Sequence, residues 1–279
     1  MQVSLGRAYL NTGDQPKATA AFEKAVALSP TPPVWNDIAF DLAESKFDLD
    51  KAEEYAESAV RATTESIGKI DLQHVTIGQL REITSLAACW DTLGWVHFQK
   101  GDTEIAERYI RAAWLLDQNG EMDDHLAQIY EKRGEKDRAI EAYALALAAP
   151  HSNPETRARL TLLLGGNSQI DDLVGNATLQ LAALRTIPAG KLLDEDAKAD
   201  FFIALSPGEK TAHVNAVRFI SGEGKMRPLA ERLRALDYGA MFPDASPVTL
   251  VRRGTLSCSA KSGDCVLILS RAEDARATD

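Results

Sequence analysis

The sequence predicts two domains of different class: an all-α stack of helical hairpins over residues 1–166 and a small α+β domain over residues 191–279. Three observations support this prediction. Small and large apolar residues recur at fixed spacings in the first half, which is typical of helical repeats. Apolar and polar residues alternate after about residue 197, as they do in strands. The length of 279 residues allows two domains, each with its own apolar core.

Two copies of the helical repeat share the same residue spacings. The first copy contains Leu5, Gly6, Tyr9, Gly13, Asp14, Ala18, Phe22, Ala25 and Pro30. The second copy contains Trp90, Leu93, Gly94, Gly101, Asp102, Ala106, Ile110 and Ala113. These spacings resemble the tetratricopeptide repeat, a hairpin of two short antiparallel helices. Glycine and alanine are expected where the helices cross, because two backbones approach closely only where a side chain is small.

Two weaker copies complete the predicted stack. One copy contains Trp35, Ile38, Ala39, Leu42, Ala52, Ala56 and Ala59. The other contains Leu126, Ala127, Tyr130, Gly134, Ala139, Tyr143 and Ala146. The resemblance therefore implies a solenoid of about four hairpins, more than the roughly three that such a stack needs for stability. The insertion at residues 65–87 is expected to be a loop followed by an extension of the helix that carries Trp90, and a helix after Asn153 is expected to cap the stack.

The resemblance also implies a binding surface. In tetratricopeptide proteins the first helix of each hairpin lines a concave face that holds a protein or peptide. The matching positions in this sequence are Arg7, Leu10, Asn11, Asn36, Phe40, Glu44, Asp91, Trp95, Phe98, Gln99, Asp124, Gln128, Glu131 and Lys132. Aromatic residues at such positions favour an apolar or aromatic anchor on the partner. The alternative is that the insertion or the C-terminal domain covers the aromatic side chains.

The composition changes after Asn167, and residues 167–190 are expected to be a linker. Strands are expected only after about Ala197, in the order strand, strand, helix, strand, strand. The first strand should place Phe201, Ile203 and Leu205 on one face. Apolar residues at helical spacing predict the helix, and these are Met226, Leu229, Leu233 and Leu236.

Short motifs in this C-terminal domain resemble the C-terminal domain of TonB-like envelope proteins. They are Phe201–Ile203, Val217–Gly222 and Phe242–Pro243. The whole chain resembles the C-terminal half of bacterial envelope proteins that carry a transglutaminase-like region upstream of tetratricopeptide repeats. This resemblance transfers no catalytic residue to the chain.

Two of the three cysteines are predicted to form a disulfide. Cys258 and Cys265 flank six residues of turn composition between two apolar strands, and pairing them would place Leu256 opposite Leu267 on the same face. Such a bridge would stabilise the fold by roughly 2 to 3 kcal/mol and would indicate an oxidising compartment. The alternative is a pair of free thiols. Cys89 is expected to be a buried apolar residue of a repeat helix.

The beginning of the chain bears on its location. Leu5 occupies the seventh position of its repeat, so the opening helix is cut short, and we expect the chain to be the C-terminal part of a longer protein; an atypical first repeat is the alternative. The opening residues lack the basic start and apolar stretch of a signal peptide, which favours the cytoplasm if Met1 is the true start. The predicted disulfide favours the periplasm or cell envelope, and we adopt that hypothesis with the cytoplasm as the alternative.

Composition and motif spacing disfavour several classes of function. A net charge of -10 with a pI near 5.1 opposes binding to nucleic acid. No run of apolar residues is long enough to span a membrane. The five histidines are scattered without the spacing of metal ligands, so neither a metal nor a cofactor is expected. We therefore predict a non-enzyme that binds a protein or peptide; the alternative is a regulatory or substrate-presenting tail of a larger transglutaminase-like enzyme.

Overall fold

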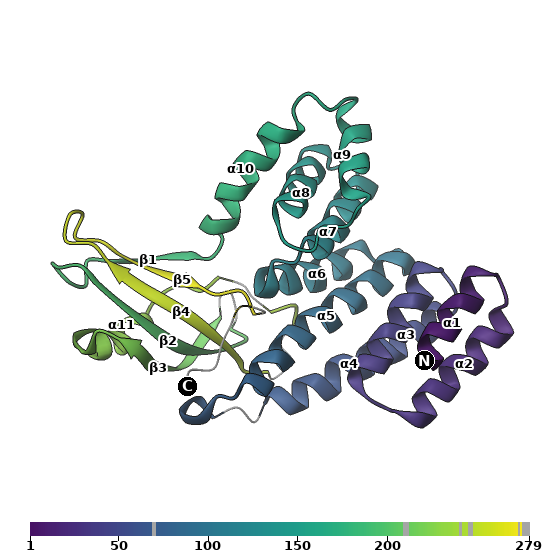
Figure 1. The fold of residues 1–279 in the computed structure, drawn as a ribbon, viewed down its shortest axis with the longest axis horizontal. Coiled ribbons are helices and arrows are strands. Elements are labelled where there is room, and N and C mark those ends of the chain that lie inside the picture. The colour runs from purple at the N-terminus through teal and green to yellow at the C-terminus, as the bar shows by residue number, and fades with distance from the viewer. Residues whose placement is uncertain (69–70, 209–211, 240–241, 245–247, 273, 275–279) are drawn as a thin grey trace.

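The computed structural model describes residues 1–279 except 69–70, 209–211, 240–241, 245–247, 273 and 275–279. Helical hairpins form one end of the molecule and a twisted sheet forms the other (Figure 1). The four hairpins are α1 (Gln2–Asn11) with α2 (Gln15–Leu28), α3 (Pro32–Glu44) with α4 (Leu49–Ile67), α5 (Ile77–Lys100) with α6 (Thr103–Asp117), and α7 (Gly120–Lys132) with α8 (Lys136–Ala148). The described residues before Leu164 contain no strand, as the sequence predicts.

Close helix crossings explain the spacing of small residues. A Cβ atom added to Gly6 would lie 2.2 Å from the Phe22 ring, and one added to Gly94 would lie 2.5 Å from Ile110. No side chain fits at either crossing, so each glycine allows the two helices of its hairpin to touch. The side chain of Asp14 caps α2, because it accepts a hydrogen bond from the backbone N–H of Lys17.

The insertion forms a short 3-10 helix, η1 (Leu72–His74), and then an N-terminal extension of α5. A capping box between Thr76 and Gln79 starts α5, which continues without a break past Trp90. The predicted helical extension is therefore confirmed, whereas residues 65–67 complete α4 instead of starting the loop, and residues 69–70 lie outside the described residues. The extension buries Leu80 and Ile83 in the same apolar core as the hairpins.

A further helical pair closes the stack. The predicted capping helix is α9 (Thr156–Leu164), and it is followed by α10 (Ile170–Ala183), which packs against α8. The chain then enters strand β1 (Thr186–Gly190) directly. The prediction of a linker over residues 167–190 is therefore wrong, and so is the expectation that no strand precedes Ala197. Burial of Ala177 and Leu181 stabilises α10 in spite of a glycine at position 175.

The C-terminal domain is a five-stranded antiparallel sheet in the order β1-β5-β4-β2-β3. The remaining elements are β2 (Ala197–Ser206), β3 (His213–Gly222), the 3-10 helix η2 (Gly224–Leu229), α11 (Ala230–Leu233), β4 (Leu250–Cys258) and β5 (Cys265–Leu269). Phe201, Ile203 and Leu205 share one face, as predicted, and are buried in one core with Met226 and Leu233. The predicted single helix is instead η2 followed by one turn of α-helix, with Pro228 inside η2.

The predicted hairpin register is confirmed. Leu256 lies opposite Leu267, and Cys258 is bonded to Cys265 at the end of the β4–β5 pair. Cys89 is free and buried, also as predicted. The disulfide therefore closes the tip of the hairpin that forms the centre of the sheet.

The sheet domain packs against the third hairpin. The phenol of Tyr109 donates a hydrogen bond to Asp244 at 2.6 Å, and the guanidinium of Arg252 donates to the backbone oxygens of Leu115 and Ser270 at 3.4 and 2.9 Å. The ring of Trp90 meets that of Phe242 edge to face. These contacts join one face of the sheet to α5 and α6, so the domain lies beside the third hairpin of the stack (Figure 1).

Candidate functional site

The first helices of successive hairpins lie side by side, because α1 contacts α3, α3 contacts α5 and α5 contacts α7. We call the surface formed by the predicted positions on these four helices the groove. The structure divides these positions by accessibility. The exposed ones are Arg7, Asn11, Glu44, Glu131 and Lys132; the half-exposed ones are Leu10, Asn36, Phe40, Phe98, Gln99 and Gln128; the buried ones are Asp91, Trp95 and Asp124.

Trp95 occupies the centre of the groove and is only 4 % exposed. Its indole Nε1–H donates a hydrogen bond to Glu44 Oε1 at 2.6 Å, so it connects α5 to α3. Its ring stacks on the imidazole of His125, with centroids 4.1 Å apart, and on Phe98, with centroids 4.8 Å apart. Trp95 is therefore a structural residue that fixes the positions of Glu44 and Phe98, rather than a surface that a partner can touch.

Side chains of the groove helices themselves cover Trp95. The described hydrogen bonds and ring contacts of the C-terminal domain with the hairpins and the insertion include Leu72, Trp90, Tyr109, Leu115 and Leu116, none of which is a groove position. The groove is therefore filled at its centre by His125 but accessible along Phe40, Phe98 and Gln99.

His125 forms a buried ion pair beneath this aromatic stack. Its Nδ1 lies 3.0 and 3.1 Å from the two carboxylate oxygens of Asp91, and the side chain is 3 % exposed. Burial alone would lower the pKa of His125. The carboxylate of Asp91, helped by those of Glu121 and Asp124, outweighs that effect and raises the pKa above its ordinary value. The pair joins α7 to α5 most strongly when the imidazole is protonated.

We expect the free energy of unfolding to fall as the pH rises through the pKa of His125 in the folded chain. Because this pKa is raised on folding, the contribution is complete below about pH 6.5, the ordinary value for histidine, and is lost above the folded value. Each unit of difference corresponds to about 1.4 kcal/mol. Asp91→Asn should flatten this dependence, because it removes the carboxylate that holds the proton. Urea titrations of both proteins at a series of pH values, from below pH 6.5 upward, give the free energy of unfolding. The same dependence of this free energy on pH in both proteins would contradict the account.

Two other predicted groove residues have structural partners. Asp124 is fully buried and accepts hydrogen bonds from Thr156 Oγ1 at 2.7 Å, from Gln128 Nε2 at 2.8 Å and from the guanidinium of Arg159. It thereby attaches the capping helix α9 to the groove. Arg7 donates to Asp41 Oδ1 at 2.6 Å and links α1 to α3.

Carboxylates outnumber cations along the groove. Desolvation raises the pKa of Glu121; His125 opposes this effect, and the nearby carboxylates of Asp91, Glu44 and Asp124 add to it. Desolvation likewise raises the pKa of Asp41, against the opposing effect of Arg7. Two buried acceptor atoms of α3, Asn36 Oδ1 and Asp41 Oδ2, have no hydrogen-bond partner among the described residues. The groove therefore concentrates carboxyl groups, and the two acceptor atoms without a partner lie beneath its surface.

Sequence reasoning missed Asp41, Glu121 and His125. It also missed Asp37, a residue of α3 whose carboxyl group interacts with Arg7. The signal for two of them was present in the aligned repeats, since Asp37 and His125 each lie directly before the apolar–alanine pair that marks the helix crossing. No comparable pattern marks Asp41 or Glu121, whose proximity to the groove depends on contacts between helices.

The environment of Cys89 is not that of a nucleophilic cysteine. Burial raises the pKa of the Cys89 thiol to about 11, whereas a nucleophilic cysteine needs a lowered pKa. In the part of the chain that the structure describes, no three His, Cys, Asp or Glu side chains are arranged to hold a metal ion. None of the described helices combines the length and apolar character required to cross a bilayer.

Two tetratricopeptide repeat family models match the chain, one over residues 1–32 and the other over residues 92–154. The chain therefore contains tetratricopeptide repeats, and the predicted fold class is confirmed. The matches do not extend into the C-terminal domain, so the resemblances stated for that domain stay predictions. A solved structure described as "Functional Characterization of Pseudomonas Aeruginosa pilF" is 19% identical and covers 66% of this chain and 90% of that chain, with a TM-score of 0.28. No curated protein matches the chain.

Proposed function

We propose that this chain is a scaffold that binds a positively charged segment of a protein or peptide in its groove, and that it acts by binding rather than by catalysis. Tetratricopeptide repeats generally mediate protein–protein interaction. The observation that carries the proposal for this chain is the arrangement around Trp95, which holds Phe98 and Glu44 in fixed, accessible positions on neighbouring helices.

Fixed side chains favour binding because a partner does not have to order them. The Phe98 ring is stacked on Trp95, and the ammonium group of Lys132 lies 4.8 Å from its centroid. Phe98 nevertheless remains half-exposed. Partly exposed aromatic rings of this kind are common anchors in interfaces. The surrounding carboxylates of Glu44, Glu121 and Glu131 favour a basic partner and would accelerate its association.

The proposed location is the periplasm or another part of the bacterial cell envelope. The disulfide between Cys258 and Cys265 supports this, because such bonds persist in oxidising compartments. The envelope resemblance of the C-terminal domain points in the same direction. A cytoplasmic location is the alternative, and cell fractionation with an antibody against the C-terminal domain would distinguish the two.

Peptides selected from a random display library on the full chain with its disulfide intact test the binding proposal. We expect the selected peptides to be basic. We expect Phe98→Ala to lower their affinity by about tenfold, because it removes a half-exposed anchor. Glu44→Gln should lower the affinity of the peptides by about fivefold, since it removes the charge but keeps an oxygen for the Trp95 hydrogen bond.

Glu23→Gln is the matched control. Glu23 is exposed on α2, the second helix of its hairpin, and lies outside the groove. Fluorescence titration should give the same affinity for this variant as for the unaltered chain. Equal affinities for all four proteins would contradict the claim that the peptide binds in the groove. A selection that yields no peptide would contradict the proposed function.

A further inference from the structure

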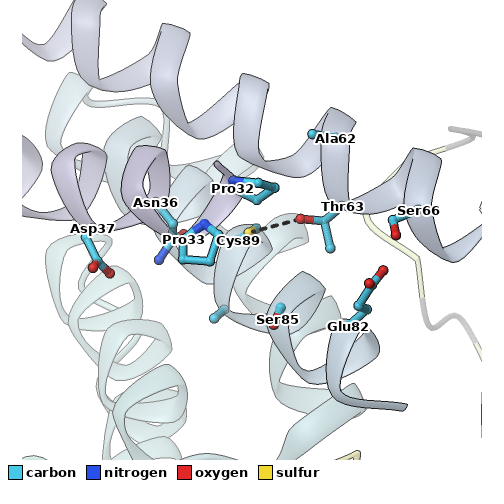
Figure 2. Close-up of a pocket in the computed structure, with 11 residues that line it drawn as sticks. Pro32, Pro33, Asn36, Asp37, Ala62, Thr63, Ser66, Glu82, Ser85 and Cys89 are labelled. Carbon is cyan, nitrogen blue, oxygen red and sulfur yellow. Dashed lines mark hydrogen bonds between the residues drawn. The ribbon is translucent and has the colours of Figure 1, made fainter. Parts of the chain in front are cut away.

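A pocket of about 500 Å³ lies where the N-terminus of α3, the C-terminal part of α4 and the extension of α5 meet (Figure 2). It continues the groove, because Asn36 belongs to both. Its lining residues are Pro32, Pro33, Asn36, Asp37, Ala62, Thr63, Ser66, Glu82, Ser85, Ala88 and Cys89. The volume is within the range of ligand pockets, roughly 300 to 1,000 Å³.

The insertion creates this pocket. It allows α4 to continue to Ile67 and α5 to begin at Ile77, so both helices have residues that line the space beside the first turns of α3. Glu82 and Ser85 come from the part of α5 that precedes Trp90. A repeat array without the insertion would lack this wall, and the groove would end at Asn36.

The polar side chains that line the pocket favour a ligand that carries positive charge. Asn36 Oδ1 is buried without a hydrogen-bond partner among the described residues. Asp37 and Glu82 lie on opposite sides of the opening, and within the described chain neither carboxylate forms an ion pair. No lysine or arginine is among the lining residues. An anionic ligand would meet two carboxylates and no cation, so the pocket excludes it.

The apolar walls of the pocket favour a ligand with an aliphatic chain. Pro32 and Pro33 line the α3 side, and Ala62 and Ala88 come from α4 and α5. Such walls can cover a chain of methylene groups, whereas a small hydrated cation would gain nothing from them. Desolvation raises the pKa of Asp37 and the guanidinium of Arg7 opposes that effect; a cation bound beside Asp37 would lower the pKa further.

We propose that this pocket holds the side chain of a lysine or arginine of the bound partner, with its methylene groups against the prolines and alanines and its cationic head near Asp37, while Glu82 adds negative charge on the other side of the pocket. The pocket thereby selects partners with a basic residue at one end of the segment that lies in the groove. This inference rests on the proposed function, because it takes the lysine or arginine to belong to a bound peptide. The pocket itself can be tested without a peptide.

The probe is Nα-acetyl-lysine N-methylamide, compared with the norleucine derivative, which has an aliphatic chain of similar length without the charge. We expect the lysine probe to shift the NMR signals of Asn36, Asp37 and Ser85 and to bind at least about tenfold more tightly than the norleucine probe. Asp37→Asn combined with Glu82→Gln should remove this preference. Both side chains lie at the opening and the substitutions are isosteric, and Glu23→Gln serves again as the control.

Each outcome decides the proposal. Equal binding of the two probes, absence of binding, or binding that is unaffected by the double substitution would overturn it. Library peptides that depend on Phe98 but tolerate the double substitution would leave the groove function standing and refute the pocket. A lysine probe that binds as expected, together with a library that yields no peptide, would establish the pocket and refute the groove function.

Discussion

Trp95→Ala is expected to lower the free energy of unfolding by about 3 to 5 kcal/mol, which is typical of a buried tryptophan truncated to alanine. The indole is 4 % exposed and contacts Phe98 on its own helix and two neighbouring helices through Glu44 and His125. Its removal leaves a cavity at the centre of the groove and takes away the ring on which the imidazole of His125 stacks. The variant should therefore lose peptide binding through loss of structure as well as loss of a contact.

Phe98→Ala is the comparison that separates structure from binding. Phe98 is half-exposed, so its truncation should cost much less stability than that of Trp95, about 1 kcal/mol. Urea unfolding followed by far-ultraviolet circular dichroism gives both values. A Trp95→Ala protein as stable as the Phe98→Ala protein would mean that the tryptophan is not a structural centre of the groove.

Arg252→Ala is expected to have an effect of similar size, about 3 to 5 kcal/mol, because it takes the cation away from the buried carboxylate of Asp117 and the donors away from two backbone oxygens. Arg252 is 2 % exposed in β4 and donates to the backbone oxygens of Leu115 and Ser270. Burial lowers its pKa to about 10, and the nearby carboxylate of Asp117 opposes this effect. The side chain joins the sheet to α6, so its loss should also separate the unfolding of the two domains.

Calorimetry tests this expectation, with one transition expected for the unaltered chain and two for the variant. Arg234→Ala is the control, since Arg234 is exposed in the same domain and its contact with Glu231 is a surface ion pair at 3.8 Å. Surface pairs contribute about 1 kcal/mol or less. A single unshifted transition for Arg252→Ala would show that this arginine does not hold the domains together.

Much of the fold can be read from the sequence because its signals are local. The repeat spacing reflects close crossings at Gly6 and Gly94, and the hairpin register follows from alternation around Cys258 and Cys265. Residues 167–190 were not predictable in this way. The helical spacing in α10 is interrupted by a glycine and an asparagine, and β1 contains Pro188 and pairs only with β5, about eighty residues later.

The groove helices were predictable, but the accessibility of each position was not. Trp95 matches a groove position by spacing, yet the structure buries it because His125, thirty residues later in sequence, stacks on its ring. Asp124 is buried in the same way by Arg159 of the capping helix. Such contacts depend on the side-chain conformations of neighbouring helices, which repeat spacing does not specify.

Photo-crosslinking of a library-selected peptide tests the central claim, that the groove holds the partner, most directly. A benzophenone amino acid replaces Gln99, a half-exposed groove position, in one protein and Glu23, on α2, in another. We expect irradiation to link the peptide to the protein modified at position 99 and to leave the protein modified at position 23 unlinked. Crosslinking at position 23 without crosslinking at position 99 would place the partner outside the groove and contradict the account.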